Sequence, residues 1–273
     1  MWRLAAGIEP ESSSGFRQKP LSLNEEFRWQ RFGLQHHSPQ DFLRSQWQSK
    51  PKSPYFLTYR WLLAGFFGTG VVSYTIKYYH NGLCFIYLTN WGFILCGITS
   101  LFGAILVSVY HCKPETWVPP SCLIKTYWAC YWTNLPLTCL IAITYWWTIY
   151  PNDRLPTNLA RVSDLYNIWT HLLPPILFTI DHFLVAQPAR LLHFVYPVAF
   201  CLSYGVFTFI YYSLGGRNIN GMHYIYSFLD YKKPKIVCGT VAGLSLMMVS
   251  LCTLQYVGYR LRTFIARKWG KLQ

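Results

Sequence analysis

Charged residues are scarce in this chain: they make up 12% of its 273 positions, whereas a typical soluble domain has about 25%. Acidic residues are the rarer kind, with 10 Asp and Glu against 24 Lys and Arg. The charges gather near the termini and in short breaks, which leaves long apolar runs between them. This distribution argues against an ordinary soluble domain and is typical of a multipass helical membrane protein.

Several familiar motifs are also absent. The chain has no HExxH, no histidine box and no Cys/His tetrad at ligand spacing, so we predict no metal. It has no GxSxG, no phosphate-binding loop and no dinucleotide fingerprint, so we predict no cofactor. The nine cysteines include no CxxC pair. Residues 1–20 lack a long apolar core, so we expect the first membrane segment to act as the targeting signal.

Long apolar segments account for most of the chain. Each is long enough to cross about 30 Å of hydrocarbon as a helix. Trp and Tyr crowd their ends, as in YWACYW and YWWTIY, which suits the aromatic belts of membrane interfaces. We therefore predict an all-α polytopic membrane protein with six transmembrane helices, at 59–79, 86–110, 122–149, 163–185, 191–213 and 236–259.

The basic residues predict the orientation. Six spans place both termini on one side, and Lys and Arg are more numerous on that side, so we expect both termini in the cytosol. The breaks near residues 82 and 156 and at 214–235 then face the lumen or the outside. The formal net charge of +14 suits contact with anionic lipid, and we expect no nucleic-acid partner.

The spans divide the chain into three parts: a cytosolic arm at 1–58, a transmembrane domain at 59–259 and a basic cytosolic tail at 260–273. Residues 1–22 have the composition of a disordered segment. The rest of the arm either rests on the membrane surface or forms a loosely ordered tail. In the first case its apolar contacts would be Trp29, Phe32, Phe42 and Trp47.

Polar residues inside the fourth predicted span form the main candidate site. Asp164, Asn167 and His171 are spaced three and four apart, so they share one helical face. Pro174 and Pro175 lack N–H groups, which leaves two carbonyls beside His171 without their helical partners, and we expect a kink there. His171 itself either makes a structural hydrogen bond between helices or has a chemical role.

A second polar site begins the second predicted span, at Thr89. Topology puts Thr89 and His171 in the same half of the membrane, and a hydroxyl beside an imidazole is the minimum arrangement for an activated nucleophile. Asp181 and His182 fall at the cytosolic end of the fourth span, where we expect a solvated pair. The long break at 214–235 carries turn signals followed by aromatics, and we expect it to dip back or lie at the interface.

At these residues the chain resembles the rolling stone family, multipass membrane proteins associated with myoblast fusion in insects. The resemblance covers about residues 25–260 and is carried by SQWQ in the arm, IYLTNWGF at the second span and NIWTHLLPPILFTID at the fourth. It implies membrane lipids as partners and a role in cell fusion or membrane lipid homeostasis. The setting it implies is the plasma membrane, or the endoplasmic reticulum and secretory pathway.

A more distant similarity suggests chemistry. The androgen-induced and androgen-dependent transmembrane hydrolases cleave fatty-acid esters of hydroxy fatty acids with an intramembrane threonine and histidine. Their motifs resemble Tyr87-Leu88-Thr89, then Asn167, His171 and Pro175, then Gly221-Met222 and Tyr226-Ser227-Phe228-Leu229-Asp230. The similarity implies Thr89 as nucleophile, His171 as base and a fatty-acyl ester as substrate. In such an enzyme Asn167 would either orient the imidazole or help hold the oxyanion. The longer arm and the double proline depart from that pattern.

Two classes of function therefore compete. One is an intramembrane ester hydrolase that uses Thr89 and His171. The other is a membrane component of cell adhesion or fusion without enzymatic activity, working through the arm at 23–58 or the loop at 214–235. A transporter is less favoured, because the sequence shows no inverted repeat.

Overall fold

The computed structural model describes residues 22–153 and 161–271, and within these ranges the chain forms helices joined by turns, with no β-strand. The predicted all-α fold is confirmed for this part of the chain. The segment 1–22, predicted to be disordered, lies outside it except for Ser22. Short helical turns occupy the arm and the loops: α1 (Leu23–Glu26), η1 (Trp29–Phe32), η2 (Pro39–Leu43), η3 (His80–Ile86) and η7 (Ser227–Leu229).

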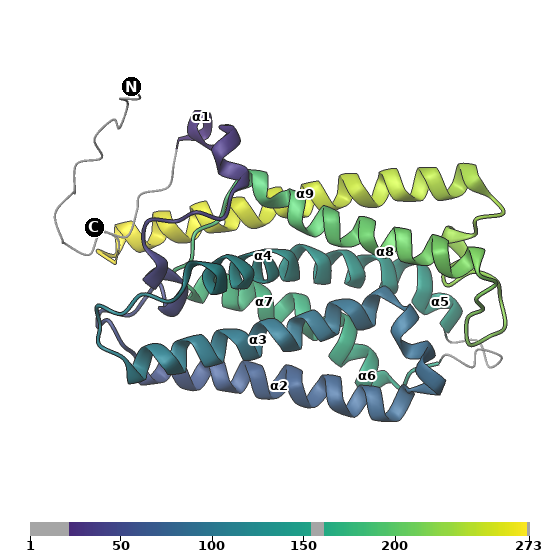
Figure 1. The fold of residues 1–273 in the computed structure, drawn as a ribbon, viewed down its shortest axis with the longest axis horizontal. Coiled ribbons are helices and arrows are strands. Elements are labelled where there is room, and N and C mark those ends of the chain that lie inside the picture. Colours follow the sequence, from purple (N-terminus) through teal and green to yellow (C-terminus); the bar gives the residue numbers. More distant parts are fainter. Residues whose placement is uncertain (1–21, 154–160, 272–273) are drawn as a thin grey trace, which may run out of the picture.

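Six long helical stretches make up most of the described residues and pack along one another (Figure 1). Each coincides with one predicted apolar segment to within several residues. Only the last helix extends well beyond its predicted segment, to Lys268. They are α2 (Pro54–Tyr78); α3 (Leu88–Cys112); α4 (Ser121–Thr144) with η4 (Tyr145–Ile149) and α5 (Tyr150–Asp153); α6 (Asp164–Asn167) with η5 (Ile168–Leu172) and α7 (Leu173–Leu184); η6 (Leu191–Phe194) with α8 (Val195–Ser213); and α9 (Pro234–Lys268).

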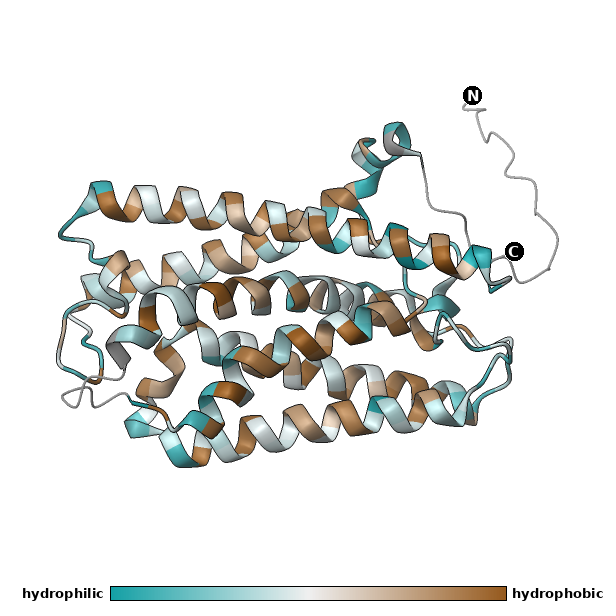
Figure 2. Ribbon diagram, turned by 180° about the vertical axis from the view of Figure 1, so that it is seen from behind, coloured by the Kyte–Doolittle hydropathy of each residue, from teal (hydrophilic) through white to brown (hydrophobic). Residues whose placement is uncertain are grey.

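Three helices of the described chain are long and apolar enough to cross a membrane: Leu88–Cys112, Leu191–Ser213 and Pro234–Lys268. Large apolar side chains also point outward from the bundle, among them Leu62, Ile76 and Leu246. Figure 2 shows hydrophobic residues along the long helices and hydrophilic residues mainly at the helix ends and in the loops. Because water disfavours such exposed apolar surface, these features indicate a membrane protein.

The helix α4 is the centre of the bundle. It contacts α3, α7, α8 and α9, and in Figure 1 it runs between the α2–α3 pair and the α8–α9 pair. Its side chains Tyr127, Trp128 and Leu137 are fully buried. It also buries Asn134, and a polar residue that faces the interior of the bundle costs less than one that faces lipid.

The arm is docked against the bundle. Phe42 is 2% exposed and belongs to the core, the Trp47 ring N–H donates to the Phe183 carbonyl at 2.7 Å, and the Gln46 N–H donates to the Leu184 carbonyl at 2.8 Å. Both expectations for residues 23–58 therefore need correction, because the inner part of the arm is ordered and faces protein. Trp29, near the outer end of the arm, is 83% exposed.

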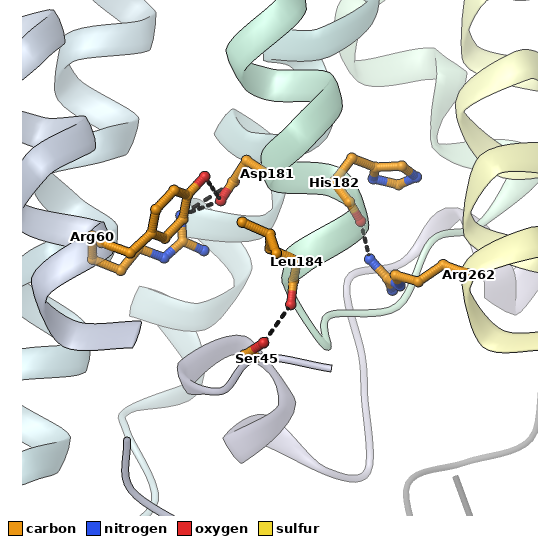
Figure 3. A network of polar contacts seen from close by, with 7 residues as sticks. Ser45, Arg60, Asp181, His182, Leu184 and Arg262 are labelled. Atoms are coloured by element: carbon orange, nitrogen blue, oxygen red, sulfur yellow. Dashed lines mark hydrogen bonds and ion pairs between the residues drawn. The ribbon is translucent and has the colours of Figure 1, made fainter. Parts of the chain in front are cut away.

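A buried charge network lies next to the docked arm, at the C-terminal end of α7 (Figure 3). Asp181 accepts from Arg60 at 3.1 Å and from the Tyr59 hydroxyl at 2.9 Å. Asp181 and Arg60 are 0% and 1% exposed, and His182 is 3% exposed. The expected solvated pair at Asp181 and His182 is therefore wrong. The cause is that Tyr59 and Arg60 of α2 pair with Asp181. His182 faces α9, where its Nε2 meets the Gln255 carbonyl and Arg262 donates to the His182 carbonyl.

Asp181→Ala tests this network. It would leave the Arg60 guanidinium buried without its carboxylate, which costs about 3–5 kcal/mol. We expect a lower melting temperature and a lower yield of the detergent-purified protein, measured by thermal unfolding with size-exclusion detection. The double variant Arg60→Met/Asp181→Leu removes both charges and should recover much of the loss. A wild-type melting temperature for Asp181→Ala would contradict this account of the network.

Candidate functional site

Thr89 and His171, the two residues singled out in the sequence, lie side by side. Thr89 is the second residue of α3, and His171 lies in η5. The Thr89 Oγ1 is 3.3 Å from the His171 Nε2, and His171 is 5% exposed. Two polar positions 82 residues apart in sequence thus form one hydroxyl–imidazole pair.

The double proline shapes the helix around His171. The expected kink takes the form of a π-helical turn, η5, in which the Leu173 N–H bonds to the Ile168 carbonyl five residues back. Pro174 and Pro175 have no N–H groups for the ordinary bonds, and widening the preceding turn accommodates that loss. The extra residue in the turn rotates the side chains before the prolines relative to those after them.

Hydrogen bonds around the ring determine which nitrogen of His171 carries the proton. The Thr170 hydroxyl donates to the Tyr166 carbonyl at 2.7 Å, so its oxygen acts as an acceptor toward His171 Nδ1 at 2.9 Å. The Asn167 carbonyl also faces Nδ1, at 3.2 Å. Nδ1 therefore holds the hydrogen, and Nε2 presents its lone pair to Thr89.

Asn167 acts on the ring through its backbone. Its side-chain amide donates instead to the Val162 carbonyl at 3.2 Å, and the residue is 2% exposed. From the sequence we expected the Asn167 side chain to orient the imidazole or help hold the oxyanion. In the structure its carbonyl contacts the ring, and Thr170 makes the shorter contact to the same nitrogen. Thr170 was not singled out from sequence, although its place directly before His171 was the available signal.

Tyr145 fixes the plane of the imidazole. Its ring stacks on His171 with centroids 3.4 Å apart and an angle of 12° between the planes. Tyr145 is the first residue of η4, a second π-helical turn, and is 5% exposed. In the sequence it lies in YWWTIY, which we assigned to the interfacial aromatic belt, so its contact with the site was missed.

The loop between α8 and α9 contacts the site. The Tyr226 hydroxyl accepts the Leu88 N–H at 3.1 Å, at the start of α3, and the ring stacks on Phe228 with centroids 5.1 Å apart. Burial raises the pKa of Tyr226 above its ordinary value, so its hydroxyl keeps its proton. The loop thus places a neutral O–H group beside Thr89.

Two cavities of different character meet at Thr89. They share Thr89, Tyr145, Ile149 and Tyr226. The polar cavity, of about 160 Å³, is also lined by Tyr87, Asn90, His171, Asn218 and Asn220. The apolar cavity, of about 90 Å³, is also lined by Leu140, Val198, Leu202, Leu244 and Met248. The Thr89 hydroxyl therefore borders a polar space on one side and an apolar space on the other.

Comparison with known proteins identifies the family. The sequence profile described as protein rolling stone matches residues 16–272. The curated protein rolling stone of Drosophila melanogaster is 32% identical over 263 residues, which cover 91% of this chain and 93% of that protein. No solved structure matches the chain. The two sequence matches cover nearly the whole length, and on them this chain belongs to the rolling stone family of membrane proteins.

Proposed function

We propose that this chain is an intramembrane hydrolase of fatty-acyl esters, with Thr89 as nucleophile and His171 as general base. The observation that carries the proposal is the 3.3 Å contact from Thr89 Oγ1 to His171 Nε2. Its support is the hydrogen bonding at Nδ1, which leaves Nε2 as the proton acceptor. A hydroxyl, an oriented base and an adjoining cavity are the parts that acyl transfer requires.

In the first half of the reaction, Thr89 Oγ1 attacks the ester carbonyl carbon while His171 Nε2 takes the hydroxyl proton. The bond from that carbon to the alcohol oxygen then breaks, and His171 gives its proton to the departing alkoxide. The products are a free alcohol and an acyl group bound to Thr89. The Thr170 and Asn167 acceptors stabilise the imidazolium through Nδ1.

In the second half, His171 takes a proton from water as the water oxygen attacks the acyl carbon. The bond to Thr89 Oγ1 breaks, that oxygen recovers its proton from His171, and a fatty acid leaves. Negative charge develops on the carbonyl oxygen in both halves. The start of α3, where Thr89 lies, and the protonated Tyr226 hydroxyl supply the favourable dipoles for it.

Thr89→Ala and His171→Ala should each lower kcat for ester hydrolysis by at least about 100-fold, the scale of a lost nucleophile or base. Thr89→Ser retains a hydroxyl and should retain measurable activity. Thr99→Ala is the matched control, because Thr99 is a buried threonine on the same helix. The assay is turnover of a fatty-acyl ester by the purified full-length chain, with folding checked by size exclusion. Full activity in either alanine variant would refute the proposal.

Thr170→Val tests whether Thr170 positions the His171 ring or only packs against its neighbours. Valine nearly matches the shape of threonine but offers no acceptor to Nδ1, so the ring loses part of the bonding that keeps its proton there. We expect kcat to fall more than about tenfold, a fraction of what general-base catalysis supplies, with little change in KM. Thr170→Ser should restore kcat. Equal losses in the valine and serine variants would mean that Thr170 serves packing alone.

We further propose that the six helical stretches all cross the bilayer with both termini in the cytosol, in the plasma membrane or the secretory pathway. The bias of Lys and Arg toward the terminal side supports this orientation. An N-glycosylation acceptor inserted after Asn220 should then receive a glycan in cells, whereas one appended after Gln273 should not. The reverse pattern would overturn the orientation.

The competing proposal is a component of cell fusion or adhesion that works without catalysis. Its support in the structure is the exposed outer end of the arm, where Phe27 and Trp29 are 63% and 83% exposed. On that proposal, substituting these two aromatics by alanine would abolish fusion in a cell-based assay, and Thr89→Ala would not.

A further inference from the structure

The apolar cavity beside Thr89 is a chamber between three helices. Its walls come from α4, α8 and α9, and residues of the loop before α9 close one side. Ser245 on α9 and Gly205 on α8 line it, and Thr89 lies at its edge. The chamber therefore ends at the hydroxyl that the proposed function makes the nucleophile.

The chamber adjoins an opening toward the outer surface. A cavity of about 250 Å³ between α4 and α9 shares Thr144, Phe228 and Leu244 with it. Other residues of this opening face outward, since Ile143 is 45% exposed and Trp147 is 82% exposed. In a bilayer, side chains exposed along such a helix contact lipid. The lipid-facing cavity and the chamber thus adjoin at Thr144, Phe228 and Leu244, and Thr89 lines the chamber.

The polar cavity lies on the other side of the same hydroxyl. Asn218 and Asn220 from the loop line it together with His171, and Tyr226, stacked on Phe228, borders both cavities. An ester has an acyl half and an alcohol half that leave its carbonyl in different directions. The two cavities at Thr89 match that division.

We propose that the acyl chain of the ester enters laterally from the bilayer between α4 and α9, passes Phe228 and occupies the chamber between α4, α8 and α9. The alcohol half and the hydrolytic water then occupy the polar cavity. This inference rests on the proposed function, and it assigns a separate cavity to each half of the substrate. It also assigns Ser245 and Gly205 as residues that determine which acyl chains fit.

The assignment of an acyl chain follows from where the chamber opens. An acyl chain is already in an apolar phase within the bilayer, so moving it into an apolar chamber gains little from the hydrophobic effect. Selection must come from how well the chain fills the space, and a mismatch of one methylene in such a pocket changes specificity by about 10–200-fold. We therefore expect the chamber to select substrates by the length of their acyl chain.

Ser245→Leu fills the chamber and tests this inference. We expect the ratio of kcat/KM for a long-chain ester over a short-chain ester to fall at least about tenfold. Ser250→Leu is the matched control, because Ser250 lies on the same helix but is exposed. The ratio in that control should equal the wild-type ratio. An unchanged ratio in Ser245→Leu would overturn the inference.

A second pair of variants tests the same inference in case Ser245→Leu fails to fold. A Cβ built at Gly205 meets no atom within 4 Å, and the same holds for Gly239 on α9, which lines none of the cavities described above. Gly205→Leu should lower the long-to-short ratio as Ser245→Leu does, and Gly239→Leu should not. If Gly205→Leu and Gly239→Leu give the same long-to-short ratio, and Ser245→Leu and Ser250→Leu also do, the chamber does not hold the acyl chain.

Photolabelling separates failure of this inference from failure of the proposed function. A photoreactive long-chain fatty acid should label peptides of α8 and α9 in the Thr89→Ala chain, and Ser245→Leu should reduce that labelling. Labelling of this kind without any ester hydrolysis would retain the chamber and reject the hydrolase. Hydrolysis with labelling only outside the chamber would reject the chamber and retain the hydrolase.

Discussion

Pro174 and Pro175 have no N–H groups to donate, so the helix that carries His171 cannot keep its ordinary hydrogen bonds across that turn. In a membrane the carbonyls left over cannot turn to bulk water. The chain responds with the π-helical turn Ile168–Leu172, in which Leu173 bonds five residues back. That turn presents His171 to Thr89 while the Asn167 carbonyl stays on the ring. The geometry of the site depends on this one local constraint.

Four separate segments of chain then complete the site. The start of α3 contributes the hydroxyl, η5 the imidazole, η4 the stacked Tyr145, and the loop before α9 the Tyr226 hydroxyl. The two π-helical turns meet at the Tyr145–His171 stack, so each ring limits the movement of the other. At the opposite end of α7 the arm and the Arg60–Asp181 pair close the bundle. That end holds the helices in place while the site end carries the cavities.

The sequence predicted the helices and singled out His171 because both leave local signals, whereas Thr89 was paired with His171 only through topology and the family resemblance. Apolar runs mark the helices, and a histidine and prolines inside one of them mark the site. The roles of Tyr145 and Thr170 were not predicted from the sequence, because they arise from π-helical turns. Such turns rotate side chains away from the positions that ordinary helical spacing gives. The burial of Asp181 was not predicted because it depends on Tyr59 and Arg60 of α2, which lie 122 and 121 residues away in sequence. Contacts of that range leave no local pattern.

In the proposed mechanism, His171 activates Thr89 toward an acyl carbon. A long-chain alkyl fluorophosphonate tests it most directly, because an activated hydroxyl displaces the fluoride and keeps a stable phosphonyl group. The purified full-length chain is treated with this probe, and the modified residue is located by peptide mass spectrometry. We expect modification at Thr89 in the wild-type chain and its loss in His171→Ala. An unmodified Thr89 in a folded protein, or equal modification without His171, would contradict it.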